Sequence, residues 1–311
     1  MSFSGDVKRE LSGHIGAARH CLIAELAALL CACGQVAADP PCLEVHTENE
    51  VPYKKTFTLL QKAFTIKSLQ EHHQEGSGWS LRITEPAEIL TVLAACGLVQ
   101  RTADGWRLEG APEERITERV CCRKAYIRGA FLGSGSINDP NKNYHLEFVL
   151  EQKEKAEKVR ELLQSFGVEA HVLSRRRFSK EIYVTYLKDG SQIADVLNIM
   201  GSHASLLRFE DIRVVKDVRN KINRQVNCEA ANLDRVISAA VRQTEDIQLI
   251  DEMIGLDTLP KGLREAAEAR LAAPDASLSE ISIQLGIGKS GVNHRFRKLL
   301  EIAESLKKNQ E

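Results

Sequence analysis

Apolar residues in the first two hundred positions follow two different spacings, and the same order of segments occurs twice. Three- and four-residue steps predict a helix over residues 152–166, and alternation of apolar and polar positions predicts strands at 168–173 and 181–187. A further helix fits residues 190–200, with an Asp-Gly turn as its start signal. The corresponding earlier segments are helices at 53–64 and 86–96 and strands at 65–71 and 79–84.

Each set is preceded by an apolar helical stretch that ends at a glycine. Residues 26–34 and 127–135 share this rhythm and lie 101 positions apart. An Asp-Pro turn signal follows each stretch, at residues 39–40 and again at 139–140, between short extended runs that predict hairpins. The predicted order is helix, two strands, helix, two strands, helix, twice over, which is an α+β fold with an internal repeat.

Small residues in the two stretches predict how the repeats meet. Ala28 and Ala32 in the first, and Gly129 and Gly133 in the second, lie four residues apart and therefore on one face of each helix. Small side chains let two helix backbones approach closely, which predicts a pseudo-twofold pair of helices. With this architecture, the stretches resemble the LAGLIDADG motif of homing endonucleases. The resemblance implies that the paired helices form a domain interface beneath a DNA-binding saddle of strands.

The chain departs from that family at the residues that support cleavage. In the family the eighth motif position is acidic and the two acids hold a divalent metal, whereas these positions are Cys33 and Ser134 here. Magnesium prefers oxygen anions, so a thiol and a hydroxyl are poor replacements, and we expect metal-assisted cleavage to be lost. Asp39 and Asp139 lie about 16 Å beyond the helix ends in an extended chain, too far to replace the acids. No catalytic residue, metal or cofactor is expected.

Local charge is more informative than total charge. The 42 Lys and Arg residues nearly balance 43 Asp and Glu, so a surface that binds a polyanion must come from local clusters. One run places four basic residues between positions 119 and 128 without an acid, which usually means a solvated surface. A second run lies in the turn between two predicted strands that border the saddle, and is the better candidate for a phosphate contact; it consists of Arg175, Arg176, Arg177 and Lys180.

The sequence contains neither a candidate membrane segment nor a recognised metal-binding motif. No stretch approaches the ~20 apolar residues that a membrane span requires, and the first residues lack the apolar core of a signal peptide. We therefore expect a cytoplasmic protein. The eight cysteines form no Cys-x-x-Cys pair, which indicates buried reduced thiols and not a zinc knuckle or a redox motif.

The last fifty residues predict a helix-turn-helix. A helix over 262–273 ends at Pro274, and residues 277–280, Ser-Leu-Ser-Glu, form a capping box that opens a short helix. Residues 286–288, Gly-Ile-Gly, predict a tight turn. A second helix follows, with Ser290 as its expected N-cap.

The second helix predicts which residues read DNA. Its apolar residues recur at three- and four-residue steps and must face the core; they are Val292, Phe296, Leu299, Ala303 and Leu306. Amide and guanidinium groups can bind base edges through two hydrogen bonds, so Asn293, His294 and Arg297 are expected near bases. The expected phosphate contacts are Lys289, Ser290, Arg295 and Lys298. The alternative is an exposed basic helix that binds no nucleic acid or that binds another protein.

A polar segment separates the repeats from this predicted reader. Residues 208–232 contain four asparagines and repeated arginines, which predict an ordered connector that caps helix ends and braces the domains. Arg219, Lys221 and Arg224 are also suited to touch a phosphate backbone. A helix over 233–253 would then begin the reader. The predicted domains are degenerate LAGLIDADG repeats at 1–110 and 111–205, a connector at 206–231, and a helix-turn-helix domain at 232–311.

Three features together resemble the WhiA family of DNA-binding regulators of Gram-positive bacteria, over nearly the whole chain. They are the degenerate double LAGLIDADG unit, the segment RNKINRQVNCEAAN at 219–232 and the segment KSGVNHR at 289–295. Arg235 stands where lysine is expected, a conservative departure. The resemblance implies a nucleoid-associated, sequence-specific transcriptional regulator of cell division, chromosome segregation or sporulation, which binds double-stranded DNA without cutting it.

Two other functions remain open at the level of the sequence. The leading alternative is an active metal-dependent endonuclease of the LAGLIDADG type. The other is a protein-interaction scaffold without a DNA role, which predicts no salt-dependent affinity for any duplex. A second regulatory protein is compatible with the repeat domain as a docking surface, and no membrane partner is expected.

Overall fold

The computed structural model of the chain describes residues 2–38, 41–74, 78–102, 105–108, 110–177 and 180–308. Two compact units are present, Met1–Asp217 and Val218–Glu311, called unit 1 and unit 2 below. Helix α8 (His203–Ile254) contributes residues to both units. Among the described helices, none combines the length and the apolar character that crossing a lipid bilayer requires.

Unit 1 contains two copies of one order of elements. The first copy is α2 (Arg19–Cys33), β1 (Gly34–Ala38), β2 (Pro41–Thr47), α3 (Glu50–Ala63), β3 (Leu69–Gln74), β4 (Gly78–Ile83) and α4 (Pro86–Ala95). The second copy is α5 (Val120–Ser134), β7 (Gly135–Ile137), β8 (Leu146–Leu150), α6 (Lys153–Gln164), β9 (His171–Arg177), β10 (Lys180–Leu187) and α7 (Gly190–Met200). The predicted α+β double repeat is confirmed.

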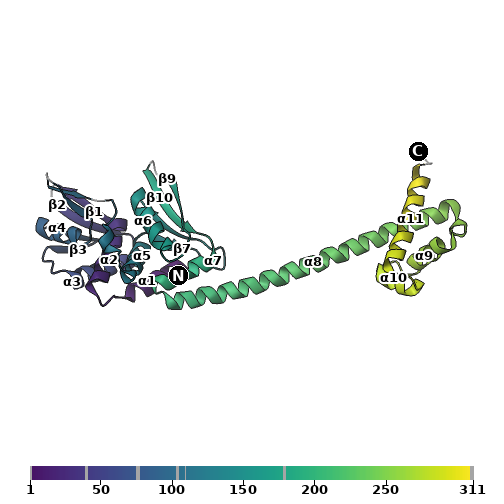
Figure 1. The fold of residues 1–311 in the computed structure, drawn as a ribbon, viewed down its shortest axis with the longest axis horizontal. Coiled ribbons are helices and arrows are strands. Elements are labelled where there is room, and N and C mark those ends of the chain that lie inside the picture. The colour runs from purple at the N-terminus through teal and green to yellow at the C-terminus, as the bar shows by residue number, and fades with distance from the viewer. Residues whose placement is uncertain are drawn as a thin grey trace. The chain divides into compact units, whose positions relative to one another are not determined.

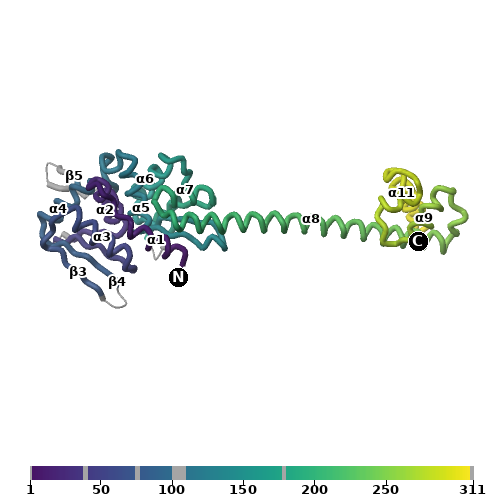
Figure 2. Tube along the Cα trace, turned by 90° about the horizontal axis from the view of Figure 1, so that it is seen from below, coloured from purple at the N-terminus to yellow at the C-terminus, as the bar shows by residue number. Residues whose placement is uncertain are grey.

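The two sheets share one topology. Their strand orders are β1-β2-β4-β3 and β7-β8-β10-β9, with every neighbouring pair antiparallel. Gly34 pairs with Val45 and Gly135 with Phe148, so each central helix runs directly into an edge strand. Figures 1 and 2 both show α2 beside α5 near the centre of unit 1, with α4 on the side of α2 and α7 on the side of α5.

Close packing of α2 against α5 joins the two repeats. A Cβ atom at Gly129 would lie 2.3 Å from the backbone oxygen of Glu25, and one at Gly133 would lie 2.7 Å from Cβ of Ala32. Residues 24–31 of α2 and 125–132 of α5 are all buried, and Leu29 and Phe131 are among the fully buried side chains of the core. The predicted contact between small-residue faces is therefore confirmed.

A buried charged group spans the same contact. Glu25 Oε1 on α2 lies 2.9 Å from Lys55 Nζ on α3 and 3.0 Å from Arg128 Nε on α5, and all three residues are at least 95% buried. The remaining donors bind backbone: Arg128 donates to the Met200 carbonyl at 3.0 Å, and Lys55 to that of Leu11 at 3.3 Å. Removing one member would leave a buried charge uncompensated, so the group ties both repeats together.

The expectation that the basic run at 119–128 is a solvated surface is wrong for at least two of its members. The guanidinium of Arg128 is buried in this charged group, and Arg123 lies 5.7 Å from the Phe166 ring centroid in a cation-π contact. At least these two members of the run hold the fold together and do not form a surface patch.

Several elements of unit 1 lie outside the predicted repeats. They are α1 (Phe3–Gly13), the hairpin of β5 (Val99–Thr102) and β6 (Gly105–Leu108), and the short 3-10 helix η1 (Glu114–Ile116). Helix α1 caps the start of α8, because Glu10 accepts hydrogen bonds from the backbone N–H groups of Ala204 at 2.8 Å and Ser205 at 2.9 Å. The apolar face of α1, with Phe3 packed near Phe209, joins the core of unit 1.

The segment predicted as a connector has a different structure. Residues 206–231 are helical throughout, and the four asparagines, Asn220, Asn223, Asn227 and Asn232, all lie inside α8 and are exposed. The prediction that they cap helix ends is wrong, since α8 has no end in this stretch.

Unit 2 is helical. After α8 come the 3-10 helix η2 (Leu256–Thr258), α9 (Lys261–Ala272), α10 (Leu278–Leu285) and α11 (Lys289–Lys308). Its core is small and contains Ile247 and Ile250 from α8, Ala266 from α9, Ile281 from α10 and Phe296 from α11. The predicted order of two short helices before a longer final helix is confirmed.

We predict that Gly129→Ala destabilises unit 1 by about 1–3 kcal/mol, because the added methyl meets a backbone oxygen that cannot rotate away. Urea unfolding followed by tryptophan fluorescence measures this change, since Trp79 and Trp106, the only tryptophans, belong to unit 1. Gly13→Ala is the matched control: nothing lies within 4 Å of its added methyl, so a change of about 0.5 kcal/mol or less is expected. Equal effects at both glycines would contradict the close helix contact.

Candidate nucleic-acid interface

A capping box begins the helix-turn-helix of unit 2. Ser277 Oγ accepts a hydrogen bond from Glu280 N at 3.3 Å, and Glu280 Oε2 accepts one from Ser277 N at 2.7 Å, as the sequence predicts. The hydrogen bond from the Ser277 backbone, followed by one from the Ser277 side chain, lowers the pKa of the Glu280 carboxyl. Helix α10 ends at Gly286 with φ of 62°, a left-handed conformation that glycine adopts without strain. Local sequence therefore sets the turn before α11.

Helix α11 has the two faces that its sequence predicts. Val292, Phe296, Leu299 and Ala303 are buried, and Leu306 packs against the same core. On the other side Asn293, His294 and Arg297 are exposed, with Lys298 beside them. These four residues are called the outer face of α11.

The start of α11 lies two residues before the one that an N-cap at Ser290 predicts. The helix begins at Lys289, and the carbonyl of Gly288 accepts the hydrogen bond from Val292 N at 3.1 Å. Ser290 is therefore an exposed residue of the first turn, and the prediction that it is the N-cap is wrong. Lys289 and Ser290 still lie at the exposed N-terminal end, where phosphate groups commonly bind.

Arg295 lies apart from the other predicted contact residues. Its Nη1 is 3.5 Å from Glu265 Oε2 on α9, and its guanidinium lies over Gly262, 3.3 Å from the position of a Cβ atom there. The side chain is only 24% exposed. Arg295 therefore contributes to the packing of α11 on α9, and its predicted phosphate contact has no support from its position.

Charge is distributed unevenly along α11. Residues 289–298 include four basic and no acidic side chains, whereas residues 299–308 include two of each. In the second half, Lys307 lies 2.8 Å from Asp246 on α8. The excess positive charge is at the N-terminal half, where the helix dipole adds further positive potential.

A groove of about 560 Å³ borders the outer face of α11 within unit 2. Asn293 and Arg297 line one side, and Arg242 and Asp246 of α8 line the other. The C-terminal part of α8 therefore flanks the side chains expected to meet bases, and Arg242 adds a basic group that the sequence analysis did not single out.

Arg270 fixes α11 against the rest of unit 2. This side chain is 1% exposed, and burial lowers its pKa. Its guanidinium donates to Gln243 Oε1 at 3.1 Å and to the carbonyls of Pro274, at 3.3 Å, and Ala276, and it lies 5.2 Å from the Phe296 ring centroid. One cation thus holds α8, the loop before α10 and α11 together.

The arginines predicted to lie in a turn of unit 1 belong to strand β9 instead, so that prediction is wrong, and Arg175 and Arg176 are divided between the two faces of the sheet. Successive residues of a strand point to opposite faces, and Arg175 pairs across from Ile182 while Arg176 pairs across from Glu181. Both arginines are exposed, but they do not form one surface. The side chain of Arg177 lies outside the described residues.

The sheet faces that point away from the helices carry mixed charge. Thr185 of β10 donates to the Ala156 carbonyl of α6, so residues of the opposite parity point away from the helices. On that face Glu147 is held by Ser136 at 3.2 Å and His145 at 3.1 Å. In the first sheet the equivalent strand carries Glu44, 3.0 Å from Arg82. In the second sheet Arg175, which lies opposite Ile182, and Lys180 are on the same face as Glu147. Only the face of the first sheet therefore offers a polyanion little net positive charge.

The two positions equivalent to the metal-binding acids lie at the ends of α2 and α5. Cys33 Sγ lies 3.5 Å from the Gly133 carbonyl, and Ser134 Oγ donates to the Ala130 carbonyl at 2.9 Å. Burial raises the pKa of Cys33 to about 11, so the thiol is neutral. Two basic residues, Lys8 and Lys155, interact with it electrostatically. Asp39 lies outside the described residues, and Asp139 accepts hydrogen bonds from Asn141.

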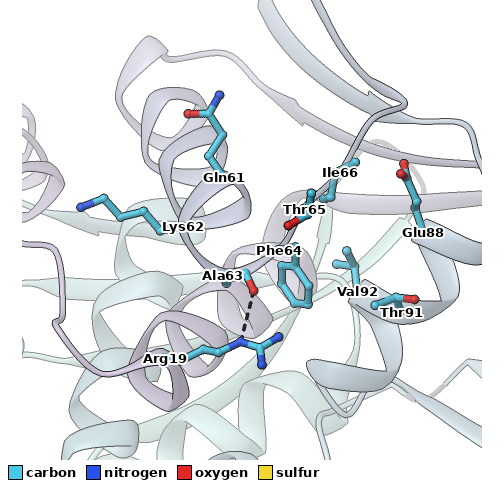
Figure 3. Close-up of a pocket in the computed structure, with 10 residues that line it drawn as sticks. All are labelled: Arg19, Gln61, Lys62, Ala63, Phe64, Thr65, Ile66, Glu88, Thr91 and Val92. Carbon is cyan, nitrogen blue, oxygen red and sulfur yellow. Dashed lines mark hydrogen bonds between the residues drawn. The ribbon is translucent and has the colours of Figure 1, made fainter.

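A pocket of about 440 Å³ in unit 1 offers no convergent chemistry (Figure 3). Arg19 donates to the Ala63 carbonyl at 3.2 Å, and Glu88 accepts from the backbone of Lys67 and Ser68 at 2.8 and 3.0 Å. Arg19 is thus used at the C-terminal end of α3, and Glu88 links the first turn of α4 to the segment before β3.

One group of side chains was missed from the sequence. His20, Cys21, Cys121 and Cys122 place their ligand atoms within 4.8 Å of one another. The sequence does contain one indication that these residues meet. The dipeptides His20-Cys21 and Cys121-Cys122 are 101 residues apart, which is the offset between the two repeats.

Comparison with known proteins gives one consistent family. Family models described as "WhiA LAGLIDADG-like domain" and "WhiA C-terminal HTH domain" match residues 123–219 and 222–303. The chain is 41% identical over 317 residues to the probable cell division protein WhiA of Lachnoclostridium phytofermentans, covering 99% of this chain and 100% of that one. It is 40% identical to the protein of the same name from Clostridium perfringens, covering 99% of each.

A solved structure supports the fold. The crystal structure of full-length WhiA from Thermatoga maritima matches with a TM-score of 0.57 at 23% identity, covering 98% of this chain and 99% of that chain. The α+β repeats and the C-terminal helices therefore occur together in a solved fold.

We predict that Arg270→Met destabilises unit 2 by about 2–4 kcal/mol, because the hydrogen bonds from a buried guanidinium to the half-buried acceptors of Gln243 and Ala276 are lost. Thermal unfolding followed by far-ultraviolet circular dichroism measures the loss. Arg264→Met, on the same helix but paired with Asp257 at the surface, is the matched control and should change stability by about 0.5 kcal/mol or less. A stable Arg270→Met variant would show that Arg270 does not hold the unit together.

Proposed function

The chain belongs to the WhiA family, and we propose that it is a sequence-specific DNA-binding regulator that reads duplex DNA through α11 and does not cleave it. Relatives at about 40% identity carry the name "probable cell division protein". These names support cell division as the regulated process. Chromosome segregation and sporulation as related processes, and action at the nucleoid, are further parts of our proposal.

The outer face of α11 carries this proposal. Asn293, His294 and Arg297 are exposed together at helical spacing, and Arg297 and Asn293 have the groups that bind the edges of guanine and adenine. Lys289, Ser290 and Lys298 lie beside them as phosphate contacts. In helix-turn-helix proteins the N-terminal residues of the second helix meet the bases, and here that half holds the excess positive charge.

The sheets of unit 1 are weaker candidates for DNA contact. Arg175 and Arg176 point to opposite faces of the second sheet, where Glu147 shares one face with Arg175. In the first sheet Glu44 pairs with Arg82. Affinity for DNA in this chain depends on local cation clusters, because the net charge is −1. We propose that α11 provides most of the affinity and that unit 1 serves as a docking surface for a second regulatory protein.

The absence of cleavage is supported by the chemistry at the helix ends. A neutral thiol at Cys33 and a hydroxyl at Ser134 do not meet the preference of magnesium for oxygen anions. Lys8 and Lys155 add positive charge near Cys33, which opposes a divalent cation there. The endonuclease alternative lacks the two carboxylates that its mechanism needs.

We predict different losses for two neighbouring basic residues of α11. Arg297→Ala should weaken binding to a selected site by about 1–3 kcal/mol and narrow the difference from a scrambled duplex, because it removes a base contact. Lys298→Ala should weaken both duplexes alike and reduce the slope of log affinity against log salt by about 0.9. Fluorescence anisotropy on a site selected by the intact chain measures both.

Lys308→Ala is the control for this pair, since it removes an exposed charge from the far end of the same helix. Its affinities should match those of the unsubstituted chain. If Arg297→Ala retains full discrimination between the two duplexes, the assignment of the outer face of α11 to base contacts is wrong.

We also predict that the purified chain leaves supercoiled plasmid DNA intact in magnesium or manganese, because no acid stands at position 33 or 134. Agarose gel electrophoresis over a time course measures nicking. Nicking that disappears in a Glu147→Gln variant would instead favour the endonuclease, with a carboxylate from the sheet as the metal ligand.

A further inference from the structure

Four metal-ligating side chains meet at the N-terminal ends of α2 and α5. His20 and Cys21 lie in the first turn of α2, and Cys121 and Cys122 lie in the first turn of α5. The two dipeptides occupy equivalent places in the two repeats, so the pseudo-twofold relation of the helices brings them together. Each repeat supplies two ligands, and neither could complete a four-ligand site alone.

The distances fit a single tetrahedral ion. His20 Nδ1 lies 3.1 Å from Cys122 Sγ, 3.3 Å from Cys21 Sγ and 4.0 Å from Cys121 Sγ. All four ligand atoms lie within 4.8 Å of one another. Zinc bonds of about 2.3 Å to sulfur and about 2.0 Å to nitrogen give tetrahedral edges of about 3.5–3.8 Å. Small rotations of these side chains would reach that geometry.

The surroundings suit thiolate ligands. Both helices begin here, and the positive end of a helix dipole favours thiolate over thiol. Cys122 is 3% exposed and Cys21 is half-buried, whereas Cys121 is exposed and gives an entry path. The adjacent Arg19 side chain points to the end of α3, where it binds the Ala63 carbonyl (Figure 3). Arg19 therefore does not occupy the space between the ligands.

The donor set selects the kind of metal. Three sulfurs and one imidazole are soft and borderline ligands, which suit zinc and not magnesium or calcium. Cysteine binds a metal as the thiolate, so metal binding releases protons and should weaken as pH falls.

We propose that His20, Cys21, Cys121 and Cys122 bind one zinc ion that joins the N-terminal ends of α2 and α5. Four protein ligands leave no open coordination position, so the ion has a structural role and supports no reaction. The site is separate from the lost endonuclease positions, because Cys33 and Ser134 lie twelve residues farther along each helix, about 18 Å away.

The test measures metal in the intact chain, purified without a histidine tag, under anaerobic reducing conditions. Inductively coupled plasma mass spectrometry should find about one zinc ion per chain. The variants Cys21→Ser, Cys121→Ser and Cys122→Ser should contain no bound zinc. Cys228→Ser, which removes an exposed thiol from α8, is the matched control and should keep its zinc. Zinc removal by a chelator should lower the Tm of the unsubstituted chain and leave that of Cys122→Ser unchanged.

Cobalt titration keeps the proposal testable if a cysteine variant does not fold. The metal-free chain should give the strong d–d absorption of tetrahedral cobalt and a sulfur-to-cobalt charge-transfer band, saturating at one equivalent. His20→Ala should shift the d–d bands, because a nitrogen ligand is lost. A chain without zinc and without these bands would overturn the proposal, as would a disulfide among Cys21, Cys121 and Cys122 in protein alkylated under anaerobic conditions.

Discussion

Contact between the backbones of α2 and α5 is the constraint on which unit 1 depends. The helices can approach closely only because Gly129 has no side chain where it meets the backbone oxygen of Glu25. The approach then places the charged group of Glu25, Lys55 and Arg128 across the joint, out of water. It also brings both pairs of helix ends together, so that residues 101 positions apart share one environment at each end.

The two ends of this helix pair have different chemistry. At the C-terminal ends, Cys33 and Ser134 stand where carboxylates hold a metal in homing endonucleases, with Lys8 and Lys155 nearby. At the N-terminal ends, an imidazole and three thiols converge. The two ends of one architecture thus carry different donor sets, and under our proposal a separate helical unit recognises DNA, through a final helix whose N-terminal half holds its excess positive charge.

Local patterns predicted most of the fold, and long-range contacts account for what they missed. Strand alternation, the capping box at Ser277 and the apolar face of α11 depend on neighbours within a few residues, so the sequence revealed them. The pairing of Arg295 with Glu265 and the meeting of His20 with Cys122 depend on the tertiary fold. Residues 206–231 were misread because asparagine is commonest at helix ends, whereas here it lies on the exposed surface of a long helix.

Helix α8 limits how the gene for this chain can be divided. Phe209 near its start belongs to the core of unit 1, and Ile247 and Ile250 near its end belong to the core of unit 2. A cut before Phe209 or after Ile247 would remove apolar side chains from one core and expose them in the separated piece. A recombination event can therefore transfer either unit with its core intact only if the junction falls in the exposed middle turns of α8. This restricts where the helix-turn-helix unit can be fused to other domains.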